Sequence, residues 1–286
     1  MHLLLSRWRV AAIFVSVLIR ASLPLCAADL KLGDIVVKHL DAIGSAPARS
    51  SLKSRVVQGG ATYRILVGGS GAIDGKFVFA SEGPKSNFLF KVHAGGYLGE
   101  QFISDGHKTS VAGTYADKRR SEFGTFVLTQ DVVLRENLLG GVWSSGWPLL
   151  DVEGRGAKLH YEGIKKVNGL ELISLRYLPR NRTDLDIFLY FDPQTYRHVL
   201  SIYELSVSTG LAGGETSQAG KQQTRYRIEE RFSDFQSKDG LTLPTHYDLR
   251  FTIELSSGFT KLVEWEVKAL DIMNNESIDP RSFQPK

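Results

Sequence analysis

The chain has 286 residues, of which 42% are hydrophobic and 23% are charged, a composition that is typical of a globular protein and excludes an intrinsically disordered one. Arg7, Arg9 and Arg20 are the only charged residues before Asp29, so the remainder carries 32 basic and 31 acidic residues. A net charge of +1 on that remainder does not argue for nucleic-acid binding.

The first 28 residues are typical of a secretory signal peptide. Arg7 and Arg9 form a basic start, residues 10–19 form an apolar run, and small residues precede Asp29. This run is much shorter than the roughly 20 apolar residues of a membrane-spanning helix, although a membrane anchor is the alternative interpretation. The single cysteine, Cys26, lies in the same segment, so the mature chain needs no disulfide in an oxidising compartment.

Two short helices are predicted in the mature chain. The first spans residues 30–43, where Ile35, Val36, His39, Leu40 and Ile43 share one face, and it ends at Gly44. The second spans residues 131–139 and ends at a pair of glycines.

Nearly all of the remaining chain alternates apolar and polar residues, as half-buried strands do. In residues 247–255, for example, every odd position is apolar and every even position is polar. Strands are predicted over 55–67, 73–81, 87–93, 100–111 (two short strands), 158–167, 170–178, 184–192, 197–206, 222–235, 242–255 and 259–272. Short turns such as Asp105-Gly106 and Asn168-Gly169 join neighbouring strands. The sequence therefore predicts a single mainly β domain over residues 29–286, with roughly a dozen antiparallel strands.

The apolar face of such a sheet needs a cover, and two short helices are too small to provide it. One solution is a curled sheet that leaves a cavity, which would suit an acyl chain at about 0.8 kcal/mol per buried methylene. The other is a sandwich of two sheets whose faces fill each other and leave no cavity. The alternation of residues fits both solutions.

Residues with the spacing of a catalytic or metal site are not found. The histidines are scattered, without the spacing of metal ligands, and no GxSxG motif is present. Ser50 and Lys53 match a serine–lysine pattern by letter only. We therefore expect a protein that is not an enzyme and holds no cofactor or metal. Trp143 and Trp147 fit either simple packing after a helix or the rim of a cavity.

Six stretches, together with the helix that follows the signal peptide, resemble in their order the LolA and LolB family of periplasmic lipoprotein carriers. They are GPKSNFLFKV (83–92), FISDGHKTSVA (102–112), FVLTQDVVLRENLLGG (126–141), LYFDPQTYRHV (189–199), DFQSKDGLTLPTHYDL (234–249) and IDPRSFQPK (278–286). The resemblance implies a mainly β (α+β) fold: a strongly curved antiparallel sheet that forms an unclosed half barrel, capped by a few short helices. It also implies a periplasmic carrier whose concave face holds the acyl chains of lipoproteins or lipids.

The expected lining of the concavity consists of apolar strand residues. They are Tyr63, Ile65, Phe77, Phe79, Phe88, Phe90, Ile187, Leu189, Phe191, Leu249, Phe251, Ile253, Val263 and Trp265. The resemblance implies a lid that includes Leu134, Leu138 and Leu139. Carriers of the family hold the lid with an arginine near the strand that resembles GPKSNFLF, and the nearest basic residue in this sequence is Lys85, which lacks the planar fork of arginine.

The partners implied by the resemblance are lipoprotein or lipid acyl chains and transfer proteins of the inner and outer membranes, and we expect a monomer that does not bind nucleic acid. The same fold could instead serve a periplasmic lipid sensor or a module that binds a protein partner. A hydrolase of lipid-like substrates is a third alternative, but it requires a nucleophile that the sequence does not show.

Overall fold

The computed structural model describes residues 30–92, 97–114, 119–209 and 222–286, and the predicted signal peptide lies outside these ranges. The compact unit begins at Lys31. Within the described ranges, no helix is both long enough and apolar enough to cross a bilayer.

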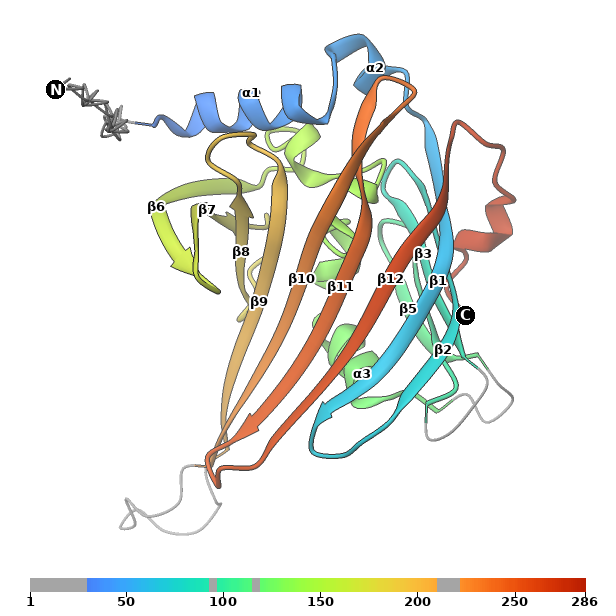
Figure 1. Cartoon of the computed structure of the whole chain (residues 1–286), viewed down its shortest axis with the longest axis vertical. Helices are drawn as coiled ribbons and strands as arrows, with labels where there is room; N and C mark the ends of the chain where they lie inside the picture. Colours follow the sequence, from blue (N-terminus) through green and yellow to red (C-terminus); the bar gives the residue numbers. More distant parts are fainter. Residues whose placement is uncertain (1–29, 93–96, 115–118, 210–221) are drawn as a thin grey trace, which may run out of the picture. The chain divides into compact units, whose positions relative to one another are not determined.

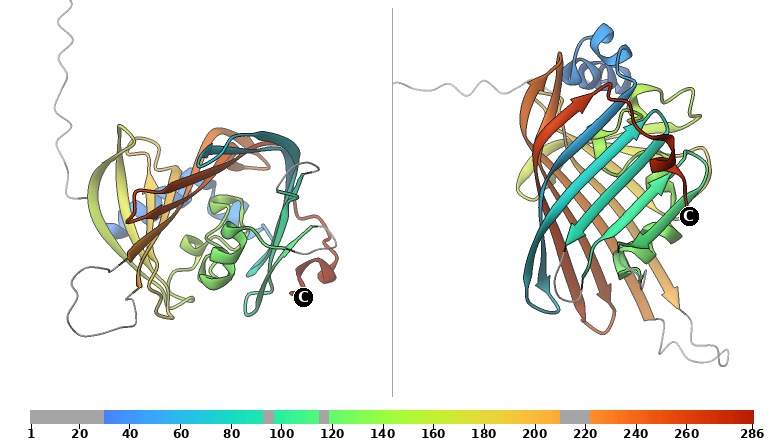
Figure 2. Two further views of the ribbon diagram at one scale, coloured as in Figure 1. Left: turned by 90° about the horizontal axis from the view of Figure 1, so that it is seen from below. Right: turned by 90° about the vertical axis from the view of Figure 1, so that its right-hand side faces the viewer.

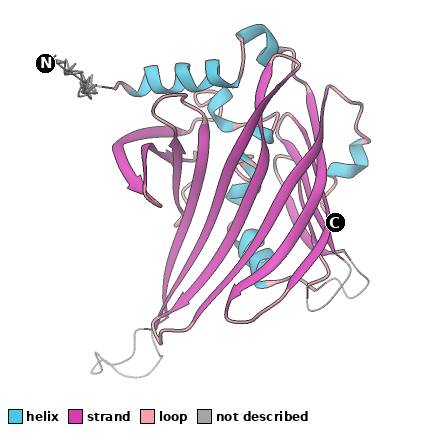
Figure 3. Cartoon of the chain, viewed as in Figure 1, coloured by secondary structure: helices cyan, strands magenta, loops and turns pink. Residues whose placement is uncertain are grey.

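Twelve strands form one antiparallel sheet in the order β5-β4-β3-β2-β1-β12-β11-β10-β9-β8-β7-β6 (Figures 1 and 3). The strands are β1 (Ser54–Val67), β2 (Ala72–Glu82), β3 (Lys85–Val92), β4 (Glu100–Ser104), β5 (Thr109–Gly113), β6 (Lys158–Val167), β7 (Leu170–Leu178), β8 (Asp186–Phe191), β9 (His198–Thr209), β10 (Gln222–Lys238), β11 (Leu241–Leu255) and β12 (Thr260–Asn274). Strands β5 and β6 are the two edges, so the sheet is not closed. The predicted mainly β fold and strand number are confirmed, and the two-sheet sandwich is wrong.

The sheet is strongly curled, and Figure 2 shows it wrapped around the helices of the middle of the chain. Two glycines mark positions where neighbouring backbones approach closely. A Cβ atom at Gly59 would lie 2.0 Å from the carbonyl oxygen of Lys268, at a register shift between β1 and β12, and one at Gly75 would lie 2.3 Å from that of Lys91. Glycine is required at such positions because any side chain would push the strands apart.

The first predicted helix is confirmed as α1 (Leu32–Ile43), and α2 (Ala46–Ser50) follows it. The predicted helix over 131–139 is confirmed only as the single turn α4 (Val132–Arg135). The central part of the chain also forms α3 (Glu122–Thr129) and two 3-10 turns, η1 (Gly141–Trp143) and η2 (Pro148–Leu150). Asn137 has a φ of 54° and cannot continue a right-handed helix. A third 3-10 turn, η3 (Pro280–Phe283), lies near the C-terminus.

Residues 119–157, which we call the central segment, connect the two edges of the sheet and fill its concave side (Figure 2). Trp143 and Trp147 are 0% and 1% exposed, so they pack as core residues. Trp143 lies against Phe77 of β2 and Tyr247 of β11, two strands that are separated by β1 and β12. The central segment therefore provides the cover that two helices could not.

Candidate functional site

The predicted lining residues lie in the interior of the curled sheet. All of them except the half-buried Ile65 are buried. Phe88 contacts Phe77, Phe90 and Tyr247 edge-on, with ring centroids 4.9–6.1 Å apart. Most of the set packs against itself and the central segment. The members that also face a pocket are Tyr63, Phe251, Ile253, Val263 and Trp265.

The predicted lid residues belong to the central segment. Leu134 is the third residue of α4, and Leu138 and Leu139 follow in the irregular chain before Gly140. All three leucines are at most 3% exposed. They therefore cover the concave face from inside it, in a segment that would have to move for the whole concavity to open.

The basic residue that holds the central segment is Arg55, which the sequence reasoning did not single out. Lys85, the candidate latch, pairs with Glu82 at 3.0 Å instead. Arg55 is 1% exposed and donates from Nη1 to the carbonyl oxygens of Val142 and Trp143 at 2.7 and 3.3 Å. Burial lowers the pKa of Arg55 to about 9, which leaves it charged at neutral pH. Nothing in the sequence marks Arg55 for this role, because it is a single arginine at the start of an alternating strand.

A buried carboxyl, Glu230 of β10, fixes the central segment at a second point. It accepts hydrogen bonds from the backbone N–H of Gly140 at 2.7 Å and from the hydroxyls of Tyr203 and Tyr247 at 2.6 and 2.7 Å. Burial raises the pKa of Glu230 to about 7, and the three hydrogen bonds oppose this rise. The carboxyl is therefore close to half-protonated at neutral pH.

Two buried histidines connect α1 to the central segment. Nε2 of His39 accepts from the indole N–H of Trp147 at 3.0 Å, so Nδ1 carries the proton and donates to the carbonyl oxygen of Tyr196 at 3.0 Å. His198 lies beside both rings and contacts the hydroxyl of Ser201. Burial lowers the pKa of His39 to about 4 and that of His198 also well below its ordinary value. His198 is the first residue of β9, whereas His39 lies within α1, and both side chains are buried.

A pocket of about 560 Å³, which we call the α3 pocket, lies between α3 and strands β9–β11. Its wall includes Phe126 and Tyr226, which stack at 5.2 Å, and its other apolar residues are Leu205, Val207, Ile253, Leu255 and Phe259. Val207, Leu255 and Phe259 are 36%, 38% and 51% exposed. The apolar lining therefore continues from the interior to the surface at this end of the sheet.

A smaller pocket of about 280 Å³, which we call the aromatic chamber, lies on the other side of the α3 N-terminus. Its aromatic lining residues are Tyr63, Tyr97, Phe123, Phe251 and Trp265. Arg120, Ser121 and Glu122 line both the chamber and the α3 pocket. These three residues therefore separate two neighbouring hollows of the concave side.

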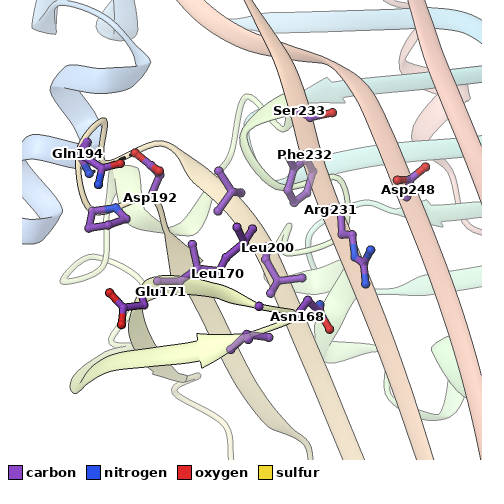
Figure 4. A pocket seen from close by; sticks show the side chains of 15 residues that line it. Asn168, Leu170, Glu171, Asp192, Gln194, Leu200, Arg231, Phe232, Ser233 and Asp248 are labelled. Carbon is purple, nitrogen blue, oxygen red and sulfur yellow. Dashed lines mark hydrogen bonds between the residues drawn. The ribbon is translucent and has the colours of Figure 1, made fainter.

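A third pocket, of about 640 Å³, lies where the β6–β7 hairpin meets β9, β10 and β11 (Figure 4). The tip of the hairpin is fixed by Asn168, which donates to Glu229 at 3.2 Å. Beside it, Leu172, Tyr190, Leu200 and Ile202 form a small separate apolar cluster. Alternation did not predict this cluster, because it lies on the strand positions between those that face the central segment.

The described ranges hold no group of three His, Cys, Asp or Glu side chains that could bind a metal ion. Ser50 has an exposed hydroxyl that donates to the carbonyl oxygen of Pro47 in the same turn. The geometry that stands out is therefore that of apolar pockets beside a fixed central segment.

Comparison with known proteins yields structural likeness only. No protein-family model matches the sequence, and no curated protein matches it. A LolA superfamily protein from Nitrosomonas europaea matches 89% of this chain and 98% of its own, with 13% identity and a TM-score of 0.44. A DUF1329 family protein from Desulfovibrio piger matches 88% of this chain and 95% of its own, with 11% identity and a TM-score of 0.43.

A chain of the MucA/MucB complex of Pseudomonas aeruginosa covers 85% of this chain and 100% of its own, with 13% identity and a TM-score of 0.24. The solved structures thus include a member of the superfamily that the sequence resembles. The likeness concerns the fold, so an assignment of function depends on the pockets themselves.

Proposed function

We propose that this protein is a periplasmic binding protein, not an enzyme, that shields an acyl chain of a lipid or lipoprotein for transfer toward the outer membrane. The observation that supports the proposal is the α3 pocket. Its volume of about 560 Å³ lies within the range of small-molecule sites, and its lining is mainly apolar. Its apolar residues reach the surface, so a chain could enter without crossing a polar barrier.

The energetics favour a flexible apolar ligand. Each methylene that leaves water for the pocket contributes about 0.8 kcal/mol, which is about a fourfold gain in affinity. A saturated fatty acid should therefore bind more tightly with each added carbon until the pocket is full. A ligand recognised mainly through its polar group would show no such dependence on chain length.

The test is a displacement assay on the mature chain, residues 29–286, with a fluorescent fatty acid and with competitors from octanoate to hexadecanoate. Leu255→Asp should weaken binding, because it places a charge at the mouth of the α3 pocket. Leu255 is 38% exposed, so the variant should still fold. Leu270→Asp is the matched control, because Leu270 is 83% exposed and lines none of the three pockets described above.

Native mass spectrometry of protein purified without detergent gives an independent result. A co-purifying acylated molecule, released by organic solvent and reduced in Leu255→Asp, would support the proposal. Failure of every fatty acid to bind, together with a clean apo mass, would contradict it.

A further inference from the structure

The aromatic chamber has the composition of a site for an organic cation. Tyr63 stacks on Tyr97 with a centroid distance of 4.5 Å, and both rings contact Trp265, at 5.3 and 5.6 Å. Phe123 closes another side, 4.8 Å from Trp265. Faces of tyrosine and tryptophan attract cations, and quaternary ammonium groups are the ligands that aromatic cages take best because their methyl groups also need apolar contact.

Two carboxylates lie at the chamber. Glu122 lines it, and the buried Glu100 lies behind Ser121, whose backbone N–H and hydroxyl each donate to it at 2.7 Å. Burial and the charges of Glu100 and Glu122 raise the pKa of Tyr63 to about 12. A cation in the chamber would therefore be stabilised by both the rings and the carboxylates.

Two cationic side chains also lie at the aromatic chamber. Lys261 and Arg120 line the chamber, and Lys261 is paired with Glu122. The four formal charges of Glu100, Glu122, Lys261 and Arg120 cancel. A zwitterionic ligand fits this arrangement better than a simple cation or anion, because each of its charges meets an opposite one.

The chamber also adjoins the α3 pocket, since Arg120, Ser121 and Glu122 line both. On the basis of the acyl-binding function proposed above, we infer that the ligand is a choline-type zwitterionic amphiphile. Its trimethylammonium group would occupy the aromatic chamber and its phosphate would contact Lys261 and Arg120. Its acyl chain would lie in the α3 pocket.

The experiment compares two probes below their micellar concentrations, dodecylphosphocholine and dodecyl phosphate, at pH 5, where the phosphate of each carries about one negative charge and the probes differ in the choline. Isothermal titration of the mature chain should show about fivefold tighter binding of dodecylphosphocholine, as a cation–π contact predicts. Tyr63→Leu should remove this preference, so that the two probes bind with equal affinity, whereas Tyr63→Phe should retain it. Tyr226→Leu, in the α3 pocket, should weaken the binding of both probes by the same factor.

Saturation-transfer NMR on the wild-type chain provides a readout that does not depend on the folding of a variant. Irradiation of the aromatic ring protons should transfer saturation to the N-methyl protons of dodecylphosphocholine more strongly than to its terminal methyl group. Equal affinity for the two probes, or tighter binding of dodecyl phosphate, would overturn the choline assignment while acyl binding stands. If neither probe and none of the fatty acids bound, the proposed function itself would be overturned.

Discussion

The substitution Glu230→Gln should stabilise the fold at pH 8 and have little effect at pH 4.5. Burial raises the pKa of Glu230 to about 7 from 4.5, against the hydrogen bonds from Tyr203, Gly140 and Tyr247. Between pH 4.5 and about pH 7, Glu230 loses its proton in the unfolded chain but keeps it in the folded chain. The free energy of unfolding therefore falls as the pH rises through this interval. The difference between the two pKa values corresponds to a loss of about 3 kcal/mol, which the amide avoids.

The amide can keep the contacts of the carboxyl. Its oxygen can accept from the N–H of Gly140 and from the hydroxyl of Tyr247, as Oε1 of Glu230 does. Its NH2 group would face the hydroxyl of Tyr203, which can turn its own proton to the carbonyl oxygen of Leu138 at 3.2 Å. The substitution therefore removes a titration and leaves no buried polar atom of this group without a partner.

The assay is urea unfolding of residues 29–286, followed by tryptophan fluorescence at pH 4.5, 6, 7 and 8. Glu229→Gln is the matched control, because burial alone would raise the pKa of Glu229 but hydrogen bonds and ion pairs with Arg227 and Arg231 outweigh it and lower that pKa. The control should lose stability above pH 4.5, where Glu230→Gln gains it. Parallel profiles of Glu230→Gln and wild type would refute the reasoning.

Three further substitutions test the central segment and its supports. Arg55→Leu should lower the free energy of unfolding by about 3 kcal/mol in urea, because the carbonyl oxygen of Val142 loses its buried donor, and Arg55→Lys should not restore it. Burial lowers the pKa of His39 to about 4, so stability present above pH 6.5 falls by about 3 kcal/mol as the pH drops to 4, and thermal unfolding should show that His39→Gln abolishes this loss. Gly124→Ala would place a Cβ 2.0 Å from Oε1 of Glu100 and should cost about 1–3 kcal/mol, measured by thermal unfolding.

For each of these three substitutions, one result would contradict the prediction. Full stability of Arg55→Leu would mean that the other contacts of the central segment, such as the hydrogen bond from Gly140 to Glu230, hold it without Arg55. A His39→Gln variant as acid-sensitive as wild type would assign the acid loss to other groups, such as the buried His198 beside it. An unchanged melting temperature of Gly124→Ala would show that Glu100 can move away without loss.

Strand alternation predicted the sheet because most strands bury one face toward the central segment. It failed for the central segment, where most side chains are buried and periodicity disappears. Residues 122–129 (EFGTFVLT) do have a polar face, because Glu122, Thr125 and Thr129 are exposed at helical spacing, but the segment is only eight residues long and contains a glycine, which weakens the helical signal. The signal that could have located α3 is Ser121, whose hydroxyl accepts from the N–H of Gly124 as an N-cap.

The pockets could not be predicted because their positions depend on contacts between distant segments. Phe251 and Ile253 are adjacent odd positions of one strand, yet Phe251 lines the aromatic chamber and Ile253 lines the α3 pocket. The position of α3 decides which hollow each residue faces. Likewise, Arg55 becomes a latch only because the central segment brings Val142 to it, and alternation contains no information about that approach.

The pairing of β1 with β12 has a consequence for folding. Arg55 of β1 donates a hydrogen bond to Asn274 of β12, 219 positions later. The β1–β12 pairing, which we call the seam, therefore joins segments that are far apart in the sequence. Contacts between residues so distant in sequence require the closure of a long loop and make folding slow. The strands on either side of the seam can form locally as two separate meanders, β1–β5 and β6–β12. We expect the two meanders to meet only in the late, rate-limiting step, which a truncation before β12 would prevent.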